Sequence, residues 1–322
     1  MIEPPCPFKN SRFDIPESLG GERLDRALSL LTGKPRSATA RMVSHGSVMV
    51  DGEPVRNGSQ RLHPGALIEL VGIHRVEGPV RLTPEEVSFD VLHADRDVVV
   101  VNKPSGVVTH RGSGHRQGTL ADALGAQYPE MAHVGEPDRP GIVHRLDRGT
   151  SGVLVCARST LAYESLVSQL SERLVRRVYA ALTRGVAPSP TGTVDAPIGR
   201  DPGNRTMMAI RADGRPARTH YRVIETFAHP IDASLLRCWL ETGRTHQIRV
   251  HLASISLPLL GDLTYGVADP FSIGRPLLHA YELRFRHPSD GSEMIFEAPI
   301  PSDFAEALRG FGSDQQAIRA LF

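Results

Sequence analysis

Residues 141–157 read GIVHRLDRGTSGVLVCA. The second half of this stretch, Gly152–Ala157, is a continuous apolar run and predicts a buried β-strand. The first half is a polar loop in which Asp147 lies between Arg145 and Arg148. Arginines favour the ionised form of a neighbouring carboxylate, and glycines allow a ligand or another backbone to approach closely. From the residues alone, the loop is either a catalytic loop or an ion pair that pins a turn.

Strands and helices are predicted on both sides of this loop. Apolar runs predict strands at Asp97–Val101, Val178–Leu182, Thr219–Phe227, Leu235–Leu240, Leu278–Arg286 and Met294–Glu297. Helical spacing predicts helices near Thr119–Leu124, Leu161–Leu174, Thr245–Ala253 and Asp303–Leu308. Many strands with few helices between them predict an α+β fold, in which flanking helices pack on a mixed, largely antiparallel β-sheet. The sequence contains neither GxGxxG nor GxxxxGK[ST], which disfavours nucleotide-cofactor folds.

A smaller α/β unit is predicted near the N-terminus. The apolar spacing of residues 24–31 indicates one helix, which Gly33 is suited to end. A second helix is predicted from Ser37 to about His45, because Ser37 can cap its first turn. Strands are predicted at 47–50 and 65–71, with a hairpin turn at Asp51-Gly52.

These elements divide the chain into four predicted parts. Residues 1–20 are rich in Pro, Gly and Ser and predict a flexible arm. Residues 21–72 form the small domain, 73–90 a linker and 91–322 the larger domain. A length of 322 residues fits two domains, and a hydrophobic share of 40% is enough for a core.

Composition excludes several classes of protein. The three cysteines (Cys6, Cys156 and Cys238) are far apart and form no CxxC pair, so neither a zinc site nor a disulfide framework is predicted. No apolar run is long enough to span a membrane, and the N-terminus lacks the features of a signal peptide. We therefore expect a cytoplasmic protein with no metal.

A formal net charge of +1 conceals an uneven charge distribution. Residues 170–222 carry ten arginines and four acids, whereas residues 280–322 carry four basic and seven acidic residues. Basic segments of this kind attract polyanions such as RNA, although they are also common on ordinary solvated faces.

Three other stretches carry candidate functional side chains. In Gly243–His251, the residues Arg244, Gln247 and His251 have a spacing that would place them on one helix face beside a cleft. Asn102–Gly106 is a turn after a buried strand, and Tyr179 follows two arginines in a predicted strand. Each feature alone also has an ordinary structural explanation.

Together, these motifs resemble the RluA-type RNA pseudouridine synthases. The resemblance covers residues from about 90 to 300 and rests on the order of five motifs: NKPSG at 102–106, HRLD at 144–147 continuing into TSG at 150–152, GRTHQIRVH at 243–251, GD at 261–262 and LHA at 278–280. Residues 21–71 resemble, more loosely, the small RNA-binding domain named after ribosomal small-subunit protein four, which long members of this family carry.

The resemblance implies an isomerase that needs no cofactor. The uracil base is detached from ribose, turned and rejoined through carbon, and the target base must be flipped out of its stack. Asp147 matches the essential carboxylate, acting either as a nucleophile or as a base at the ribose. Arg249 matches the residue that pairs with this aspartate. Tyr179 matches the aromatic that stacks on the base and would also assist proton transfer. Arg145 matches the residue that replaces the flipped nucleotide. His144, Leu146 and Thr150 would shape the loop.

The implied partner is RNA, and 23S ribosomal RNA is favoured because of the N-terminal domain. Lys34, Arg36 and Arg41 would contact phosphates there and add affinity more than sequence readout. We expect a monomer. Three alternatives remain open: the same chemistry on transfer RNA, a non-catalytic RNA-binding or ribosome-assembly protein, and an N-glycosidase in which Asp147 works with Glu241 or Asp262.

Overall fold

The computed structural model describes residues 11–33, 39, 42–43, 48–55, 57–70, 87–111, 118–204, 206–266 and 269–313. The chain divides into two compact units, Met1–Val80 and Arg81–Phe322, which we describe separately. The fold agrees with the predicted α+β class: a large, mostly antiparallel sheet with helices, and a small N-terminal α/β unit.

The small unit contains a four-stranded sheet in the order β1-β4-β2-β3 and the helix α1. The elements are β1 (Arg12–Asp14), the 3₁₀ helix η1 (Glu17–Leu19), α1 (Leu24–Thr32), β2 (Val48–Val50), β3 (Glu53–Pro54) and β4 (Leu67–Leu70). The apolar face of α1, including Leu24 and Leu28, packs on Ile68 of β4 in a core of its own. Gly33 ends α1 in the left-handed conformation, with φ of 64°, as predicted.

The predicted flexible arm is wrong for residues 11–20. β1 pairs antiparallel with β4, and Ile15 is buried in the core of the small unit. The apolar residues Phe13 and Ile15 alternate with polar neighbours, as in a strand. β1 itself has only three residues, which is too short to be recognised in a segment that also contains proline and glycine. The predicted second helix lies largely outside the described residues, and so do Lys34, Arg36 and Arg41.

The larger unit is built on a nine-stranded sheet. Its strands, with the β10–β11 pair, are β5 (Asp90–Ala94), β6 (Val98–Lys103), β7 (Ser151–Ala157), β8 (Arg176–Arg184), β9 (Thr191–Asp195), β10 (Ile198–Arg200), β11 (Met208–Ile210), β12 (Arg218–Phe227), β13 (Ala233–Leu240), β14 (Leu278–Arg286) and β15 (Glu293–Glu297). Its helices are α3 (Leu120–Gln127), η3 (Pro129–His133), α4 (Thr160–Ser171), α5 (Gln247–Ser254) and α6 (Ser302–Gly310).

The strand order β5-β6-β7-β14-β8-β13-β12-β9 brings distant parts of the sequence together, and β15 pairs with β14. Every described pair in this sheet is antiparallel except β7–β14. At this parallel junction Ser151 lies opposite His279, which in turn lies opposite Ala180 of β8. The loop that precedes Ser151 therefore ends with only β14 between it and the middle of β8. Gly152 is required here, because a Cβ would lie 2.1 Å from the carbonyl oxygen of Ala280.

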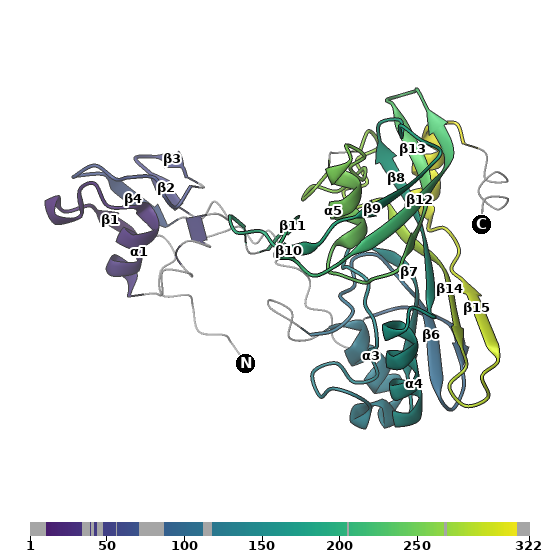
Figure 1. Ribbon diagram of the computed structural model, residues 1–322. Helices are drawn as coiled ribbons and strands as arrows, with labels where there is room; N and C mark the ends of the chain where they lie inside the picture. The colour runs from purple at the N-terminus through teal and green to yellow at the C-terminus, as the bar shows by residue number, and fades with distance from the viewer. Residues whose placement is uncertain are drawn as a thin grey trace. The chain divides into compact units, whose positions relative to one another are not determined.

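The two faces of the large sheet support separate cores. Tyr179 and Ala181 of β8 belong to the core that includes residues of α3 and α4, whereas Ala180 and Leu182 pack with Phe304 of α6. Figure 1 shows α3 and α4 beside the lower part of the sheet and α5 beside its upper part. Successive side chains of β8 thus pack into the cores on opposite faces of the sheet, because successive residues of a strand point to opposite faces.

Several short elements at the margins of the sheet were not predicted. β5, β9, β10 and β11 are only three to five residues long. The first of them, β5, begins inside the predicted linker, and Val87 already packs in the core of the larger unit. The predicted helix at 245–253 begins two residues later, at Gln247, because His246 adopts the left-handed conformation with φ of 57°.

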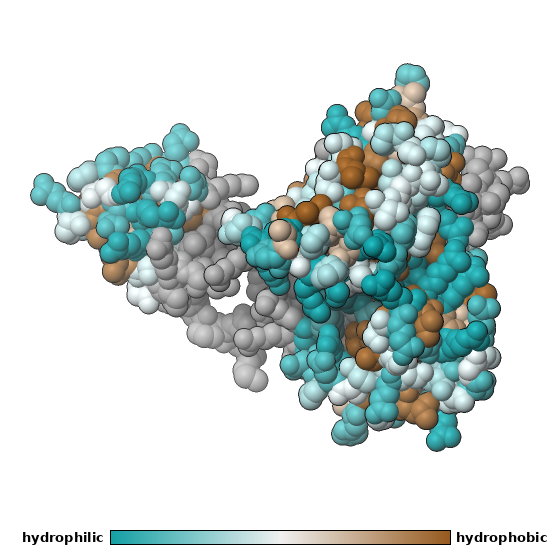
Figure 2. All heavy atoms as spheres, in the orientation of Figure 1, coloured by the Kyte–Doolittle hydropathy of each residue, from teal (hydrophilic) through white to brown (hydrophobic). Residues whose placement is uncertain are grey.

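On the face shown in Figure 2, hydrophobic residues are scattered among hydrophilic ones. None of the helices in the described ranges is long and apolar enough to cross a membrane.

Candidate active site

A cleft of about 520 Å³ opens in the larger unit, and its lining includes five residues of the predicted polar loop: His144, Arg145, Leu146, Asp147 and Thr150. Its walls come from the loop at 139–150, from the ends of α4 and β8, and from the segment 240–249. Asp147, Arg145, Tyr179 and Arg249 all line it. The fold thus brings together four residues that span more than one hundred positions.

Backbone and side-chain hydrogen bonds from the 102–111 segment hold the Asp147 loop. The Thr109 hydroxyl donates to the carbonyl of Leu146 (2.7 Å), and the Gly106 N–H donates to the carbonyl of Arg148 (2.8 Å). The buried Lys103 braces this segment, because its Nζ donates to the carbonyls of Pro104 and Val107. Burial lowers the pKa of Lys103 to about 7, against the opposing charge of Asp147. The NKPSG motif is therefore a support for the loop.

The Asp147 carboxylate lies near the side chains of Arg249 and His246. Its Oδ2 accepts a hydrogen bond from Nη1 of Arg249 at 3.4 Å, and Nε2 of His246 lies 3.9 Å from the same oxygen. This oxygen faces groups that stabilise negative charge, and the carboxylate still lines the open cleft. The arrangement leaves Asp147 oriented but able to reach a ligand.

Arg249 is held in turn by Asp262. Nε and Nη2 of Arg249 donate to the two carboxylate oxygens of Asp262 at 2.6 and 2.8 Å, and both residues are buried. Burial alone would lower the pKa of Arg249, but the hydrogen bonds and charges of Asp262 and Asp147 outweigh burial and raise it. Burial likewise would raise the pKa of Asp262, yet Arg249 and two backbone N–H groups lower it overall. Both groups are therefore charged at neutral pH.

His246 and Tyr265 complete this side of the cleft. The Tyr265 hydroxyl oxygen accepts from the Met208 N–H (2.6 Å), which leaves its proton for Nδ1 of His246 at 2.8 Å. The proton of a neutral His246 then lies on Nε2, the nitrogen that faces Asp147. Burial lowers the pKa of His246 more than Asp147 raises it, which favours this neutral form. The Arg249 guanidinium also lies 4.9 Å from the centre of the Tyr265 ring.

Tyr179 and Arg145 occupy different depths of the cleft. Tyr179 is buried, and burial raises the pKa of its phenol, so the hydroxyl is protonated near neutral pH. A protonated phenol donates a hydrogen bond but cannot accept a proton from carbon without a further base. Arg145 is exposed at the rim, where its Nη1 lies 3.4 Å from Nε2 of His110.

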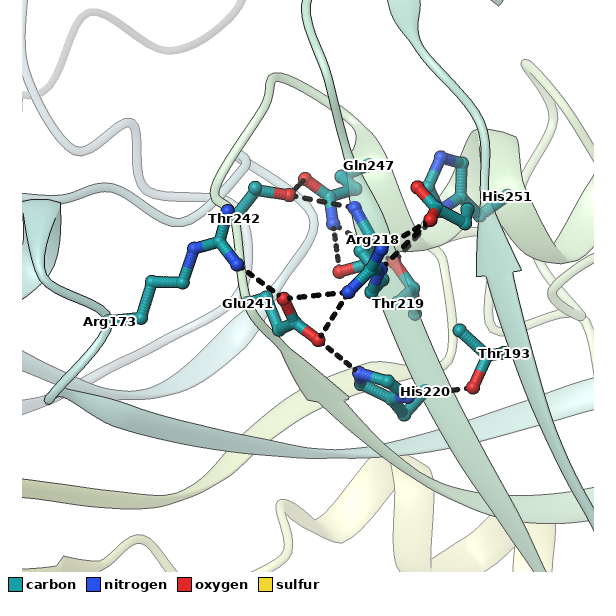
Figure 3. Close-up of polar contacts among 10 residues, drawn as sticks. Arg173, Thr193, Arg218, Thr219, His220, Glu241, Thr242, Gln247 and His251 are labelled. Atoms are coloured by element: carbon teal, nitrogen blue, oxygen red, sulfur yellow. Dashed lines mark hydrogen bonds and ion pairs between the residues drawn. The ribbon is translucent and has the colours of Figure 1, made fainter.

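The prediction that Arg244, Gln247 and His251 share one helix face is wrong. Arg244 precedes α5, and its N–H donates to the side chain of Gln247. Figure 3 shows Gln247 and His251 reaching toward β12, where both bond the Thr219 hydroxyl. These buried polar groups fasten α5 to β12, and of the two only Gln247 also lines the cleft. Their polarity resembled that of cleft residues because buried polar groups also need partners.

Neither carboxylate considered as a glycosidase partner of Asp147 is available. Asp262 is fully engaged by Arg249, as described above. Glu241 accepts from Arg173 at 2.7 Å, from Arg218 at 3.4 Å and bonds His220 at 2.8 Å (Figure 3). Because both carboxylates have several partners within the fold, the described residues of the site offer no pair of free acids for hydrolysis.

Sequence reasoning missed the supporting residues Asp262, His246 and Tyr265 as a set. Asp262 and His246 lie within quoted motifs, but nothing in their spacing shows that both converge on Arg249 and Asp147. Tyr265 lies outside every motif. Its signal is visible only in the turn at 262–266, in which the Asp262 carboxylate accepts from the N–H groups of Thr264 and Tyr265.

Comparisons with known families agree with this geometry. Residues 97–254 match the family model described as RNA pseudouridylate synthase, a range that includes Asp147, Tyr179 and Arg249. Residues 22–68 match the model of the S4 domain.

Whole-chain relatives extend these matches. An RNA pseudouridine synthase of Chloroflexus aurantiacus is 47% identical over 92% of this chain and 92% of its own. The ribosomal large subunit pseudouridine synthase D of Nitrosomonas europaea is 40% identical over 95% of this chain and 87% of its own. Among solved structures, human RNA pseudouridylate synthase domain containing 1 is 30% identical with a TM-score of 0.52, covering 66% of this chain and 84% of that one. The chain therefore belongs to the RluA family of RNA pseudouridine synthases and carries an N-terminal S4 RNA-binding domain.

Proposed function

We propose that this enzyme converts specific uridines of 23S ribosomal RNA to pseudouridine in the cytoplasm, with Asp147 as its essential carboxylate. Several relatives near 40% identity, from Nitrosomonas, Neisseria and Pasteurella, are named ribosomal large subunit pseudouridine synthase D. Each covers more than nine-tenths of this chain, including the S4 domain. The shared length favours a shared class of RNA.

One observation carries the assignment of Asp147. The described residues that line the cleft include two carboxylates, Asp147 and Glu241. Glu241 is bound by two arginines and a histidine, whereas Arg249 contacts Asp147 through a single long hydrogen bond of 3.4 Å. Asp147 is thus the carboxylate with free lone pairs that face the cleft.

The reaction exchanges one bond to ribose for another. The N1–C1′ bond breaks, the C5–C1′ bond forms, and the proton on C5 moves to solvent while N1 gains one. An ionised Asp147 can attack C1′ as a nucleophile or remove the proton on C2′ as a base, and both routes use the charge that Arg249 and His246 orient. The chemistry changes no oxidation state of the protein and calls for no cofactor.

The remaining predicted residues would bind the RNA. Tyr179 offers its ring to the flipped base at the bottom of the cleft, where base stacking is sequence-tolerant. Arg145, exposed at the rim, would enter the space that the base leaves. Lys34, Arg36 and Arg41 of the S4 domain would contact phosphates of the same RNA. The part boundaries at 21–72, 73–90 and 91–322 stay predictions.

Pseudouridine mapping in cells tests the substrate. Total RNA from cells with and without this protein is treated with carbodiimide and mapped by reverse-transcriptase stops. We expect stops at particular 23S rRNA uridines to vanish in the deletion and to return with the wild-type gene but not with Asp147→Asn. Loss of stops in transfer RNA alone would overturn the ribosomal assignment, and an unchanged map would overturn both assignments.

A further inference from the structure

Arg177 lies two residues before Tyr179 on β8 and lines the same cleft. Alternate residues of a strand point to the same face, so both side chains leave β8 on the side of the cleft. Only 8% of Arg177 is exposed. The structure therefore places a buried cation next to the proposed base-stacking ring.

Three arginines of the described chain are equally buried, each 8% exposed. Arg249 binds Asp262 through two hydrogen bonds, and Arg275 binds Asp303 in the same way at 2.5 and 2.6 Å. Arg177 differs from both. Its Nε is buried and makes no hydrogen bond, and no carboxylate of the described residues lies within 4.0 Å of its guanidinium.

An unpaired guanidinium in this position is unfavourable in the free protein. Burial lowers the pKa of Arg177, which shows that its charge has lost solvent without gaining an acid. Arginine nevertheless stays protonated under all ordinary conditions, because its unperturbed pKa is far above neutral. A buried charge of this kind requires a compensating partner, and the cleft is where such a partner can enter.

Other polar atoms in the cleft also lack partners. Four buried side-chain atoms in the described ranges make no hydrogen bond, and three of them belong to residues that line this cleft: Nδ1 of His110, Oγ1 of Thr150 and Nε of Arg177. Gly243 leaves space for the guanidinium, because a Cβ at that position would lie 2.7 Å from Nη1 of Arg177. Three residues of the cleft thus carry buried hydrogen-bonding atoms without a partner, and the guanidinium of Arg177 holds one of these atoms.

We propose that Arg177 binds a backbone phosphate of the target nucleotide, beside the base that stacks on Tyr179. The inference rests on the proposed role of this cleft as the uridine site. A phosphodiester supplies both the negative charge and the two acceptor oxygens that a guanidinium fork matches. Uracil carbonyls would supply acceptors without charge, and the buried cation would remain uncompensated.

A chemical double-mutant cycle tests the contact. A short RNA that the wild-type enzyme modifies is prepared with the phosphate on either side of the target uridine replaced by a neutral methylphosphonate. We expect one replacement to weaken binding by about ten- to a hundredfold, the range for a charge-assisted hydrogen bond. Arg177→Gln should weaken binding of the RNA with its natural phosphates by the same factor. Binding of the methylphosphonate RNA by Arg177→Gln should be little weaker than with either change alone.

Arg176→Gln is the matched control. Arg176 neighbours Arg177 on β8 but is half exposed, lies outside the cleft and is 4.0 Å from Glu282. Its loss should leave the effect of the methylphosphonate unchanged. Arg177→Lys keeps the charge without the fork and should restore part of the affinity, provided that thermal unfolding shows each variant to be folded.

Additive effects of Arg177→Gln and every methylphosphonate would overturn the proposal. A second cycle replaces the target uridine with 4-thiouridine. If the effect of Arg177→Gln on binding is non-additive with this replacement and additive with the methylphosphonates, Arg177 contacts a uracil carbonyl, and the phosphate contact is overturned. This test does not depend on the proposed ribosomal substrate, because the cycle uses any RNA that the wild-type enzyme modifies. A failure of the ribosomal assignment is therefore distinguishable from a failure of the phosphate contact. If Arg177→Gln does not fold, the comparison of Arg177→Lys with wild type on the two RNAs decides the question by the same coupling.

Discussion

Arg249 binds Asp262 through Nε and Nη2 and turns only Nη1 toward Asp147, at 3.4 Å. Asp262 is 1% exposed and belongs to a turn that also supplies Tyr265. The buried acid therefore fixes the arginine, and the arginine orients the proposed catalytic carboxylate. Positioning through a second residue is a common way to hold a reactive group in its productive geometry.

Asp262→Asn should lower kcat by about tenfold or more while the protein remains folded. The amide NH₂ of asparagine would face one donor nitrogen of Arg249, so one of the two hydrogen bonds between the side chains would be lost. Arg249 would then no longer be held in place, and Asp147 would lose its orientation. A loss of about 3 kcal/mol in the free energy of unfolding is expected with it, because a buried pair is broken. Single-turnover kinetics and urea unfolding measure the two effects.

Glu282→Gln is the control for that experiment. Glu282 is also 1% exposed and also binds an arginine, Arg284, through two hydrogen bonds of 2.7 and 2.8 Å. Neither residue lines the cleft. The variant should lose stability with unchanged kcat, and an equal loss of kcat in both variants would contradict a positioning role for Asp262.

Tyr265→Phe should lower kcat by roughly three- to tenfold with little change in KM. The variant removes the hydroxyl that fixes the His246 tautomer, at the energy of one hydrogen bond, about 1 kcal/mol. The ring and its contact with Arg249 are kept, so RNA affinity should persist. Tyr281→Phe, which removes an exposed hydrogen bond to Glu297, provides the comparison. A Tyr265→Phe enzyme with wild-type kcat would show that the His246 orientation is unimportant.

Stability should fall in mild acid because of buried neutral histidines. Burial lowers the pKa of His279 to about 4, where its Nδ1 bonds Ser151 and its Nε2 bonds the Ala298 carbonyl. Between pH 6.5 and 4 the His279 imidazole is protonated in the unfolded chain but neutral in the folded chain. The free energy of unfolding therefore decreases as pH falls, by on the order of 3 kcal/mol for this residue.

Urea unfolding from pH 7.5 to 4 measures that decrease, and His279→Gln should remove part of the slope. Glutamine does not titrate in this range, so the difference between the two curves isolates His279. Parallel curves would mean that His279 is protonated in the folded state and that its assigned hydrogen bonds are wrong.

Central strands of the larger unit were predictable, whereas its margins were not. β7 and β8 are buried on both faces and appear as largely apolar runs, so both strands can be recognised without tertiary information. β9, β10 and β11 are only three to five residues long, and their pairing depends on neighbours distant in sequence. A strand of three residues carries too little pattern to be distinguished from a loop.

The site was predictable as motifs but not as geometry. Arg249 and Asp147 are 102 residues apart, and only the family resemblance joined them beforehand. His251 shows the converse error, because its polarity indicated a cleft while the fold uses it to fasten α5 to β12. Arg177 gave no signal at all, since an arginine in a basic segment looks solvated until its burial is known.

Release of tritium from C5 tests the central claim most directly. Purified wild type and Asp147→Asn are incubated with 23S rRNA labelled with tritium at C5 of uridine, because formation of the C5–C1′ bond expels that hydrogen. The wild type should release tritium stoichiometrically with the modified uridines, and Asp147→Asn should release none while binding the RNA with similar affinity. Release by Asp147→Asn at the wild-type rate would contradict the account.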